Sequence, residues 1–311
     1  MQNLHALRDR LSNTVHLLDG GLATELERWG HDITGKLWSG HVLIEHPDAI
    51  EQVHFHYLCA GADVIITASY QITPQGLVEA GYGADAGQQL LNRSVTLAEG
   101  ARARFVATTN LSAQPLIAAS VGPYGAYLAD GSEYHGNYGL SENELQAFHR
   151  ERLSVLASSG ADVIAFETIP SITEARALAR LAAEYADLSA WLSFSCRDGQ
   201  HLNDGTHIRD AANAVLDIYP NLLATGVNCT APRHIESLLD ALASDLDVVL
   251  LAYPNSGEGW NAATRTWEGE NDPYSFADYA DRCVAAGARL IGGCCRTGVE
   301  HVERLRAART R

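Results

Sequence analysis

The chain has 311 residues, of which 46% are hydrophobic and 19% charged, the balance of an ordinary globular protein in water. Its formal net charge of -16 argues against nucleic acid and anionic membrane surfaces as partners, because both need basic patches. The first residues lack the apolar core and cleavage site of a secretory signal, and no apolar run reaches membrane-spanning length. We therefore expect a cytoplasmic protein whose six cysteines are thiols, metal ligands or core residues.

Eight short apolar runs recur along the chain and are nearly continuous in Val, Ile, Leu and Ala. Runs of this length are too short for stable helices and are typical of buried parallel strands. In chain order they are VHLLDGG (15–21), ADVIITASYQ (62–71), LIAASVGPYG (116–125), ADVIAFETIP (161–170), AWLSFSC (190–196), LATGVNCT (223–230), VVLLAYPNSG (248–257) and ARLIGGCCRT (288–297). The sequence therefore predicts eight strands.

Segments with helical spacing separate these runs. The segment 47–62 opens with proline and aspartate, as the first turn of a helix often does. In the segment 141–161, Ser141 is followed three residues later by Glu144, which is a capping-box pattern. The segment 272–288 ends at a glycine, a common helix stop. Strands and helices thus alternate along the chain.

This alternation predicts an α/β protein with a (β/α)8 barrel fold. No linker rich in Pro, Gly or Ser divides the sequence, so we expect a single domain over residues 1–311. The rival is a doubly wound open sheet, for which GYGADAG (81–87) superficially resembles a dinucleotide-binding fingerprint. That segment does not directly follow a predicted strand, and we discount it.

The chemistry of such barrels gathers at the carboxyl ends of the strands. The side chains there are Asp19, SYQ (69–71), Glu167, Cys196, Asn228, Cys229, YPNSGE (253–258), Cys294 and Cys295. Cys229 with Cys294 and Cys295 would supply three thiols to one volume and leave room for a fourth ligand, the arrangement of a catalytic zinc ion. Thiolates favour zinc over magnesium or calcium.

Other interpretations of the cysteines are simpler. Free cysteine is often a core residue, and we interpret Cys59 and Cys283, each on a predicted helix in apolar company, in that way. The sequence offers no second cysteine at a spacing that would pair with Cys196, so a structural role is a simpler interpretation for it than a catalytic one. The adjacent pair 294–295 could be a redox pair, although a disulfide between neighbours is strained. We expect the glycines at 292–293 to let the backbone bend so that both thiols reach one metal.

Seven motifs strongly resemble the homocysteine S-methyltransferase family, above all its bacterial and plant members that use S-methylmethionine as methyl donor. They are LLDGGLATELERWG (17–30), ITASYQ (66–71), SVGPYGAYLADGSEY (120–134), FETIP (166–170), GVNC (226–229), YPNSGE (253–258) and GGCCRT (292–297). The resemblance implies a (β/α)8 barrel with one zinc ion per chain, held by Cys229, Cys294 and Cys295. It also implies methyl transfer from a sulfonium donor, S-methylmethionine or S-adenosylmethionine, to the thiolate of L-homocysteine, giving methionine.

The amino-acid end of homocysteine carries an ammonium group that needs an anionic partner. Asp19 and Glu167 are the carboxylates at the predicted strand ends. Asp19 could instead cap the helix that follows it, whereas Glu167 has no Lys or Arg nearby in sequence, which favours a functional role. Asn228, beside a predicted zinc ligand, would orient the substrate or a ligand, or make only a strand-end backbone bond.

A sulfonium donor suits an acidic protein with aromatic side chains at its binding site. The tyrosine-rich loop 122–140 is a candidate lid or donor wall, with Tyr124, Tyr127 and Tyr134 as candidate contacts, and 255–272 is similar; both could equally be ordinary solvated loops. The expected partners are small molecules. A betaine- or selenocysteine-directed methyltransferase, and a zinc–thiolate barrel protein that transfers no methyl group, stay open, as do monomer and dimer.

Overall fold

The structure is a computed structural model that describes residues 4–109, 113–243, 246–261, 266–268 and 273–309. Eight strands form one parallel sheet in the order β1-β10-β7-β6-β5-β4-β3-β2. They are β1 (His16–Leu17), β2 (Val64–Ile66), β3 (Leu116–Val121), β4 (Val163–Ile169), β5 (Ala190–Phe194), β6 (Ala224–Asn228), β7 (Val249–Tyr253) and β10 (Ala288–Ile291). Each strand lies in one of the eight predicted runs.

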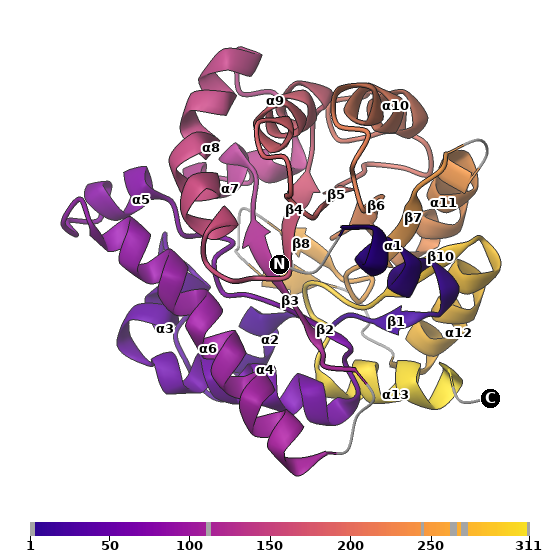
Figure 1. The fold of residues 1–311 in the computed structure, drawn as a ribbon, viewed down its shortest axis with the longest axis horizontal. Coiled ribbons are helices and arrows are strands. Elements are labelled where there is room, and N and C mark those ends of the chain that lie inside the picture. The colour runs from indigo at the N-terminus through magenta and orange to yellow at the C-terminus, as the bar shows by residue number, and fades with distance from the viewer. Residues whose placement is uncertain (1–3, 110–112, 244–245, 262–265, 269–272, 310–311) are drawn as a thin grey trace.

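The first and last strands of this order meet and close the sheet into a barrel. The amide of Asp63 donates to the carbonyl of Leu17 at 2.7 Å, and the amide of Asp19 donates to the carbonyl of Val64 at 3.1 Å. Figure 1 shows the helices arranged around the strands. The predicted (β/α)8 barrel is therefore confirmed.

The helices follow the sequence signals closely. They are α1 (Leu4–Asn13), α2 (Leu22–Arg28), α3 (Ser39–Glu45), α4 (Pro47–Ala60), α5 (Pro74–Glu79), α6 (Ala86–Thr108), α7 (Tyr124–Leu128), α8 (Glu142–Ala157), α9 (Ile172–Ala183), α10 (Ile208–Ile218), α11 (Ile235–Ala243), α12 (Pro273–Ala285) and α13 (Val299–Arg309), with 3-10 turns η1 (Ser132–Tyr134) and η2 (Pro232–His234). Helix α4 starts with its proline, and α8 has the expected capping box between Ser141 and Glu144. The segment 81–87 joins two helices, α5 and α6, so it is not a dinucleotide-binding turn after a strand.

The loop after β7 holds a feature that the sequence did not reveal. A short antiparallel hairpin of β8 (Gly259–Asn261) and β9 (Thr266–Glu268) lies within the segment 255–272. The rest of that predicted donor wall, at 262–265 and 269–272, falls outside the described residues.

The hydrophobic core has two layers. The larger one packs the outer helices against the sheet. The smaller one fills the barrel, where Leu7 and Leu11 of α1 pack with strand residues such as Val64 and Trp191. Helix α1 therefore closes the amino-terminal end of the barrel, and it lies to the right of the centre in Figure 1. The opposite end, where the strands finish, is left for chemistry.

The two cysteines that were predicted to be core residues lie in different environments. Cys283 is buried in the core as predicted, but Cys59 is exposed. The inward face of α4 is formed by residues such as Val53 and Tyr57, and Cys59 points away from it.

Across the described residues, none of the helices combines the length and apolarity that a membrane crossing requires.

Candidate active site

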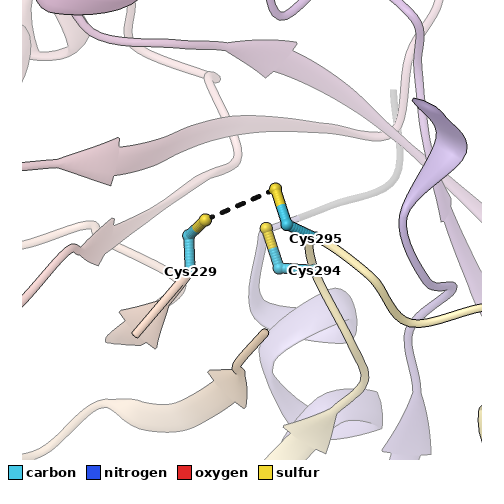
Figure 2. A group of neighbouring side chains, drawn as sticks. All are labelled: Cys229, Cys294 and Cys295. Atoms are coloured by element: carbon cyan, nitrogen blue, oxygen red, sulfur yellow. Dashed lines mark hydrogen bonds between the residues drawn. The ribbon is translucent and has the colours of Figure 1, made fainter. Parts of the chain in front are cut away.

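Three cysteine thiols meet at the carboxyl end of the barrel. Cys229 follows β6, and Cys294 and Cys295 lie in the turn after β10; the single strand β7 separates β6 from β10. Their three sulfur atoms lie within 4.8 Å of one another, and the Sγ atoms of Cys229 and Cys295 are 3.6 Å apart. Figure 2 shows the side chains pointing toward one another. The juxtaposition that the sequence suggested is thus present in the structure.

The backbone that presents these thiols is tightly packed rather than simply flexible. A Cβ atom on Gly293 would lie 2.2 Å from Oγ1 of Thr297, and one on Gly292 would lie 2.5 Å from Cβ of Leu18. Neither glycine has a positive φ angle. We expected these glycines to let the chain bend, but they serve a different purpose. Because glycine has no side chain, the turn can pack closely against Leu18 and Thr297.

Positive φ angles occur instead at residues with side chains around the site. Cys229 has φ 45°, Thr168, after Glu167, has φ 62°, and Arg296, after Cys295, has φ 63°. Such conformations cost energy in residues that carry a Cβ atom and cluster at functional sites. The amide of Cys229 donates to the carbonyl of Tyr253 at 3.1 Å, which holds the strained residue in place.

The thiol group fits a metal ion by its chemistry and by its dimensions. Hydrogen bonds from Cys294 and then from Cys295 lower the pKa of Cys229 well below its ordinary range, while the pKa values of the two donors are raised. Three sulfurs this close cannot all ionise without a cation between them. Tetrahedral zinc with bonds of about 2.3 Å sets its sulfur ligands about 3.8 Å apart. Within the described part of the chain, no other set of three or more potential ligands comes together in this way.

Glu167 lies deep in the barrel at the end of β4. Its two carboxylate oxygens accept hydrogen bonds from the hydroxyls of Ser120, on β3, and Tyr253, on β7, the second at 3.1 Å. Burial, with a smaller contribution from the charge of Cys229, raises the pKa of Glu167 to about 7, against the opposing effect of these two hydrogen bonds. Among the described residues, the groups that shift its pKa include no basic side chain, so none of them supplies a counter-charge to the ionised carboxylate.

Asp19 has one carboxylate oxygen without a hydrogen-bond partner, and its charge interacts with that of Glu167. Its Oδ2 accepts a hydrogen bond from the amide of Ile66 at 2.8 Å, whereas its Oδ1 is buried with no hydrogen-bond partner. Burial raises its pKa well above the ordinary value, and the charge of Glu167 adds to this. The helix-cap alternative does not hold, because the N-cap of α2 is Gly21 and no side chain caps it. An orphaned carboxylate oxygen in a buried site calls for a cationic ligand.

Asn228 connects several of these groups from the end of β6. Its Oδ1 accepts hydrogen bonds from the amide of Thr168 at 2.6 Å and from Ser193 Oγ at 2.8 Å. Its Nδ2 donates to Oγ1 of Thr168 at 2.8 Å and lies 3.9 Å from the sulfur of Cys294. Asn228 is fully buried, so its place is behind the thiols, where it fixes Cys294 and the strained residue after Glu167.

The tyrosines of the loop after β3 lie in two different environments. The ring of Tyr124 packs against Tyr127, Tyr138 and Phe148. Tyr134, by contrast, reaches the thiols, with its hydroxyl 3.6 Å from the sulfur of Cys229. Tyr134 is therefore the tyrosine of this loop with a contact to the thiol group, while contact between Tyr124 and a donor stays a prediction.

A buried polar network supports this loop from behind. Glu174, on α9, accepts hydrogen bonds from the amide of Tyr124 at 2.6 Å and from His149 at 2.8 Å, and the other ring nitrogen of His149 lies 2.8 Å from Arg152. Arg152 also donates to the carbonyl of Gly122 at 2.5 Å. Since these side chains are almost wholly inaccessible to water, the network fixes the start of the loop to α8 and α9.

Some contacts of the site could not be predicted from the sequence. Ser120 and Tyr253 hold Glu167 but come from β3 and β7, so the contact depends on the register across the barrel. Their place near the ends of predicted strands was the available signal. Glu133 was not singled out either, although it immediately precedes Tyr134.

The closed (β/α)8 barrel carries three clustered thiols and two buried carboxylates, Asp19 and Glu167, at one end, the donor types that suit a soft metal and a cationic ligand. The family model described as homocysteine S-methyltransferase matches residues 16–309. Together with relatives that are more than 40% identical over most of their length, this shows that the chain belongs to the homocysteine S-methyltransferase family. It is a methyltransferase that acts on homocysteine.

The similar proteins share the whole barrel. Homocysteine S-methyltransferase YbgG of Bacillus subtilis is 47% identical over 294 residues, which cover 94% of this chain and 93% of the relative. The selenocysteine Se-methyltransferase of Brassica oleracea is 42% identical, covering 95% and 90%. The metallated form of the homocysteine methyltransferase MmuM from Escherichia coli has a TM-score of 0.87 at 44% identity, covering 98% of this chain and 99% of MmuM. Its oxidized form has a TM-score of 0.86 at 44% identity, covering 94% and 95%.

Proposed function

We propose that this enzyme transfers a methyl group from a small sulfonium donor, S-methylmethionine or S-adenosylmethionine, to the thiolate of L-homocysteine and so forms methionine. One zinc ion per chain is the proposed cofactor, with Cys229, Cys294 and Cys295 as its ligands. Asp19 and Glu167 are the proposed partners of the homocysteine ammonium group, within one homocysteine-binding domain over residues 1–311. The observation that carries the proposal is the meeting of three thiols and two unneutralised buried carboxylates at one end of the barrel.

The chemistry explains why thiols and acids are both needed. Homocysteine attacks through sulfur, and only its thiolate is a good nucleophile. A free thiol with a pKa near 8.5 is only about 3% ionised at pH 7. When bound by the three cysteines, zinc supplies a positive charge that keeps a coordinated thiol deprotonated. The protein's own carboxylates hold the amino-acid end, and this positioning sets the sulfur in line with the methyl carbon.

The preferred donor is tested by a panel. Homocysteine is incubated with S-methylmethionine, S-adenosylmethionine or betaine, and methionine is quantified. Use of homocysteine carrying deuterium on its carbon chain distinguishes new methionine from the methionine that S-methylmethionine leaves behind. We expect labelled methionine with the sulfonium donors, and equal amounts of labelled and unlabelled methionine from S-methylmethionine. Labelled methionine from betaine alone would refute the proposed donor class.

One relative suggests a second methyl acceptor for the same panel of substrates. The similarity to a selenocysteine Se-methyltransferase favours a test of selenocysteine beside homocysteine in the same panel. A selenol and a thiol offer the same kind of soft nucleophile, and the amino-acid ends of the two acceptors carry the same charges. The ratio of kcat/KM values for the two acceptors decides which is the better substrate.

The change Glu167→Gln is expected to weaken homocysteine binding by about tenfold or more, because a charge-assisted hydrogen bond is worth roughly 1.5–3 kcal/mol. Zinc content should stay the same. Calorimetric titration with homocysteine, alongside metal analysis of the same samples, checks both. Unchanged affinity in a folded, zinc-loaded variant would remove Glu167 from the substrate site.

The same carboxylate predicts a pH dependence. An ammonium ligand favours the ionised carboxylate, so its binding lowers the pKa of Glu167 from the value of about 7 in the free protein. The gain in affinity is therefore complete above about pH 7 and is lost as the pH falls below it. Methionine, which has the same amino-acid end without a thiol, isolates this effect in a titration. We expect a weaker pH dependence in Glu167→Gln than in the wild type, because Asp19, whose pKa is also raised by burial, is then the one proposed partner left to titrate.

Removal of the metal should expose the thiols to oxidation. In air, the chelated protein is expected to lose activity and to form a disulfide between Cys229 and Cys294 or Cys295, since a bridge between the two adjacent cysteines is strained. The 3.6 Å separation of Cys229 and Cys295 makes this pair the first candidate. Peptide mass mapping locates the bridge, and reductant plus zinc should restore activity. Equal oxidation rates with and without zinc would contradict the prediction.

A further inference from the structure

A third carboxylate, that of the half-buried Glu133, belongs to the loop that reaches the thiols and has no role in the site described so far. Glu133 belongs to η1, directly before Tyr134, whose hydroxyl lies 3.6 Å from the sulfur of Cys229. The Oε2 atom of Glu133 is shielded from water and has no hydrogen-bond partner within the described structure. A buried polar atom left in this state costs free energy unless a ligand satisfies it.

The charges that act on this carboxylate include that of Cys229. Burial, with smaller contributions from the charges of Cys229 and Asp130, raises the pKa of Glu133 to about 7, against the opposing effect of its own backbone amide. Burial is also the main reason that the pKa values of Tyr70 and Tyr134 are raised, and the charge of Glu133 contributes to both. The carboxylate thus acts on Cys229 and on two tyrosines around it.

The backbone of Glu133 is fixed in place without help from its side chain. A Cβ atom on Gly125 would lie 2.3 Å from the amide nitrogen of Glu133, so η1 packs directly on α7. Ser195, after β5, donates through its hydroxyl to the carbonyl of Glu133 at 3.4 Å. The amide of Ser132 donates to Oδ1 of Asp130 at 2.9 Å. The side chain is therefore free to serve a ligand from a rigid turn.

The three carboxylates of Asp19, Glu167 and Glu133 exceed what the one ammonium group of homocysteine can neutralise. Asp19 and Glu167, at the ends of β1 and β4, interact through their charges, and homocysteine brings a single ammonium group to them. Glu133 lies on the loop after β3, next to Tyr134, which contacts the sulfur of Cys229. We propose that Glu133 is the counter-charge for the sulfonium centre of the methyl donor, and that it thereby sets the preference for cationic donors. This inference rests on the proposed function and deepens it.

The reaction itself shows which kinetic constant Glu133 should control. The carbon–sulfur bond of the sulfonium breaks as the methyl carbon bonds to the homocysteine sulfur, and the bonding electron pair stays on the leaving sulfur. A cation and a thiolate thus become two neutral thioethers, after the thiol proton has left to solvent. Because the positive charge is already fading in the transition state, Glu133 stabilises the bound donor more than the transition state. Its loss should raise KM for the donor without lowering kcat.

The test compares Glu133→Gln with the wild type in steady-state methyl transfer from S-methylmethionine to homocysteine. Glutamine keeps the shape of the side chain and removes its charge. The matched control is Glu303→Gln, the same change at an exposed position on α13. For Glu133→Gln we expect KM for the donor to rise about tenfold, kcat to be equal or higher, and the homocysteine affinity and zinc content to be unchanged. Glu303→Gln should match the wild type throughout.

Two results would overturn the inference, and they are distinct from failure of the proposed function. If Glu133→Gln has wild-type KM for the donor, or loses kcat with KM unchanged, Glu133 does not neutralise the bound sulfonium. If its homocysteine affinity falls instead, Glu133 belongs to the acceptor site. Absence of methyl transfer from any sulfonium donor in the wild-type enzyme would refute the proposed function itself, and the inference with it.

Discussion

The double change Cys294→Ala plus Cys295→Ala is expected to abolish zinc binding and methyl transfer together. It removes two of the three thiols that lie within 4.8 Å of one another, and one remaining thiolate cannot form a zinc site. Without zinc, the homocysteine thiol would be only about 3% ionised at pH 7, because its pKa is near 8.5. This effect alone would lower the rate by about thirtyfold. Metal analysis of the purified variant and the labelled-methionine assay measure the two losses.

The control for this variant is Cys59→Ala, which removes an exposed thiol on α4. It should keep one zinc per chain and full activity. If the double variant retained one zinc ion per chain, the metal would be bound by other residues, and the proposed site would be wrong. Single changes at Cys229, Cys294 and Cys295 should each lower the zinc content, since the proposed site needs all three ligands.

The change Arg152→Ala is expected to lower the free energy of unfolding by about 3–5 kcal/mol, the usual cost of removing one partner from a buried charge network. Burial lowers the pKa of Arg152 to about 10, against the opposing effect of Glu174, so the guanidinium is still charged at neutral pH. Its removal leaves the carbonyl of Gly122 and the ring of His149 without their donor, and leaves Glu174 buried without its nearby positive charge. Denaturant unfolding followed by circular dichroism measures the loss.

Arg150, two residues away on α8, provides a matched control. It is exposed and forms a surface ion pair with Glu184. Such pairs are worth about 0–1 kcal/mol, so Arg150→Ala should have little effect on the same unfolding curve. Equal destabilisation by the two variants would mean that Arg152 contributes no more than a surface arginine, and that the network does not support the loop after β3.

The alternation of strands and helices could be predicted because it depends on local patterns. A buried parallel strand needs a short continuous apolar run, and a helix start needs proline or a capping box, and both can be recognised without knowledge of the partner segments. The thiol cluster followed from the same reasoning, because all parallel strands of a barrel end at one mouth. Cys229 and the pair 294–295 could thus be brought together although more than sixty residues separate them.

Features that depend on packing between distant segments could not be predicted. Ser120 and Tyr253 reach Glu167 because three strands place them in one layer of the barrel, which no local pattern encodes. Cys59 has apolar neighbours in sequence, but the rotation of α4 turns it outward. The glycines before Cys294 are needed for close contacts with Leu18 and Thr297 rather than for an unusual backbone angle.

An X-ray absorption spectrum at the zinc edge, recorded with and without homocysteine, tests most directly whether three thiols hold a metal that leaves a position for the substrate. Three protein thiols within 4.8 Å of one another are the structural basis of that claim. We predict three sulfur neighbours from the protein in the absence of substrate and a fourth sulfur when homocysteine is added. Four protein ligands that do not change on addition of homocysteine would define a closed structural site and contradict the claim.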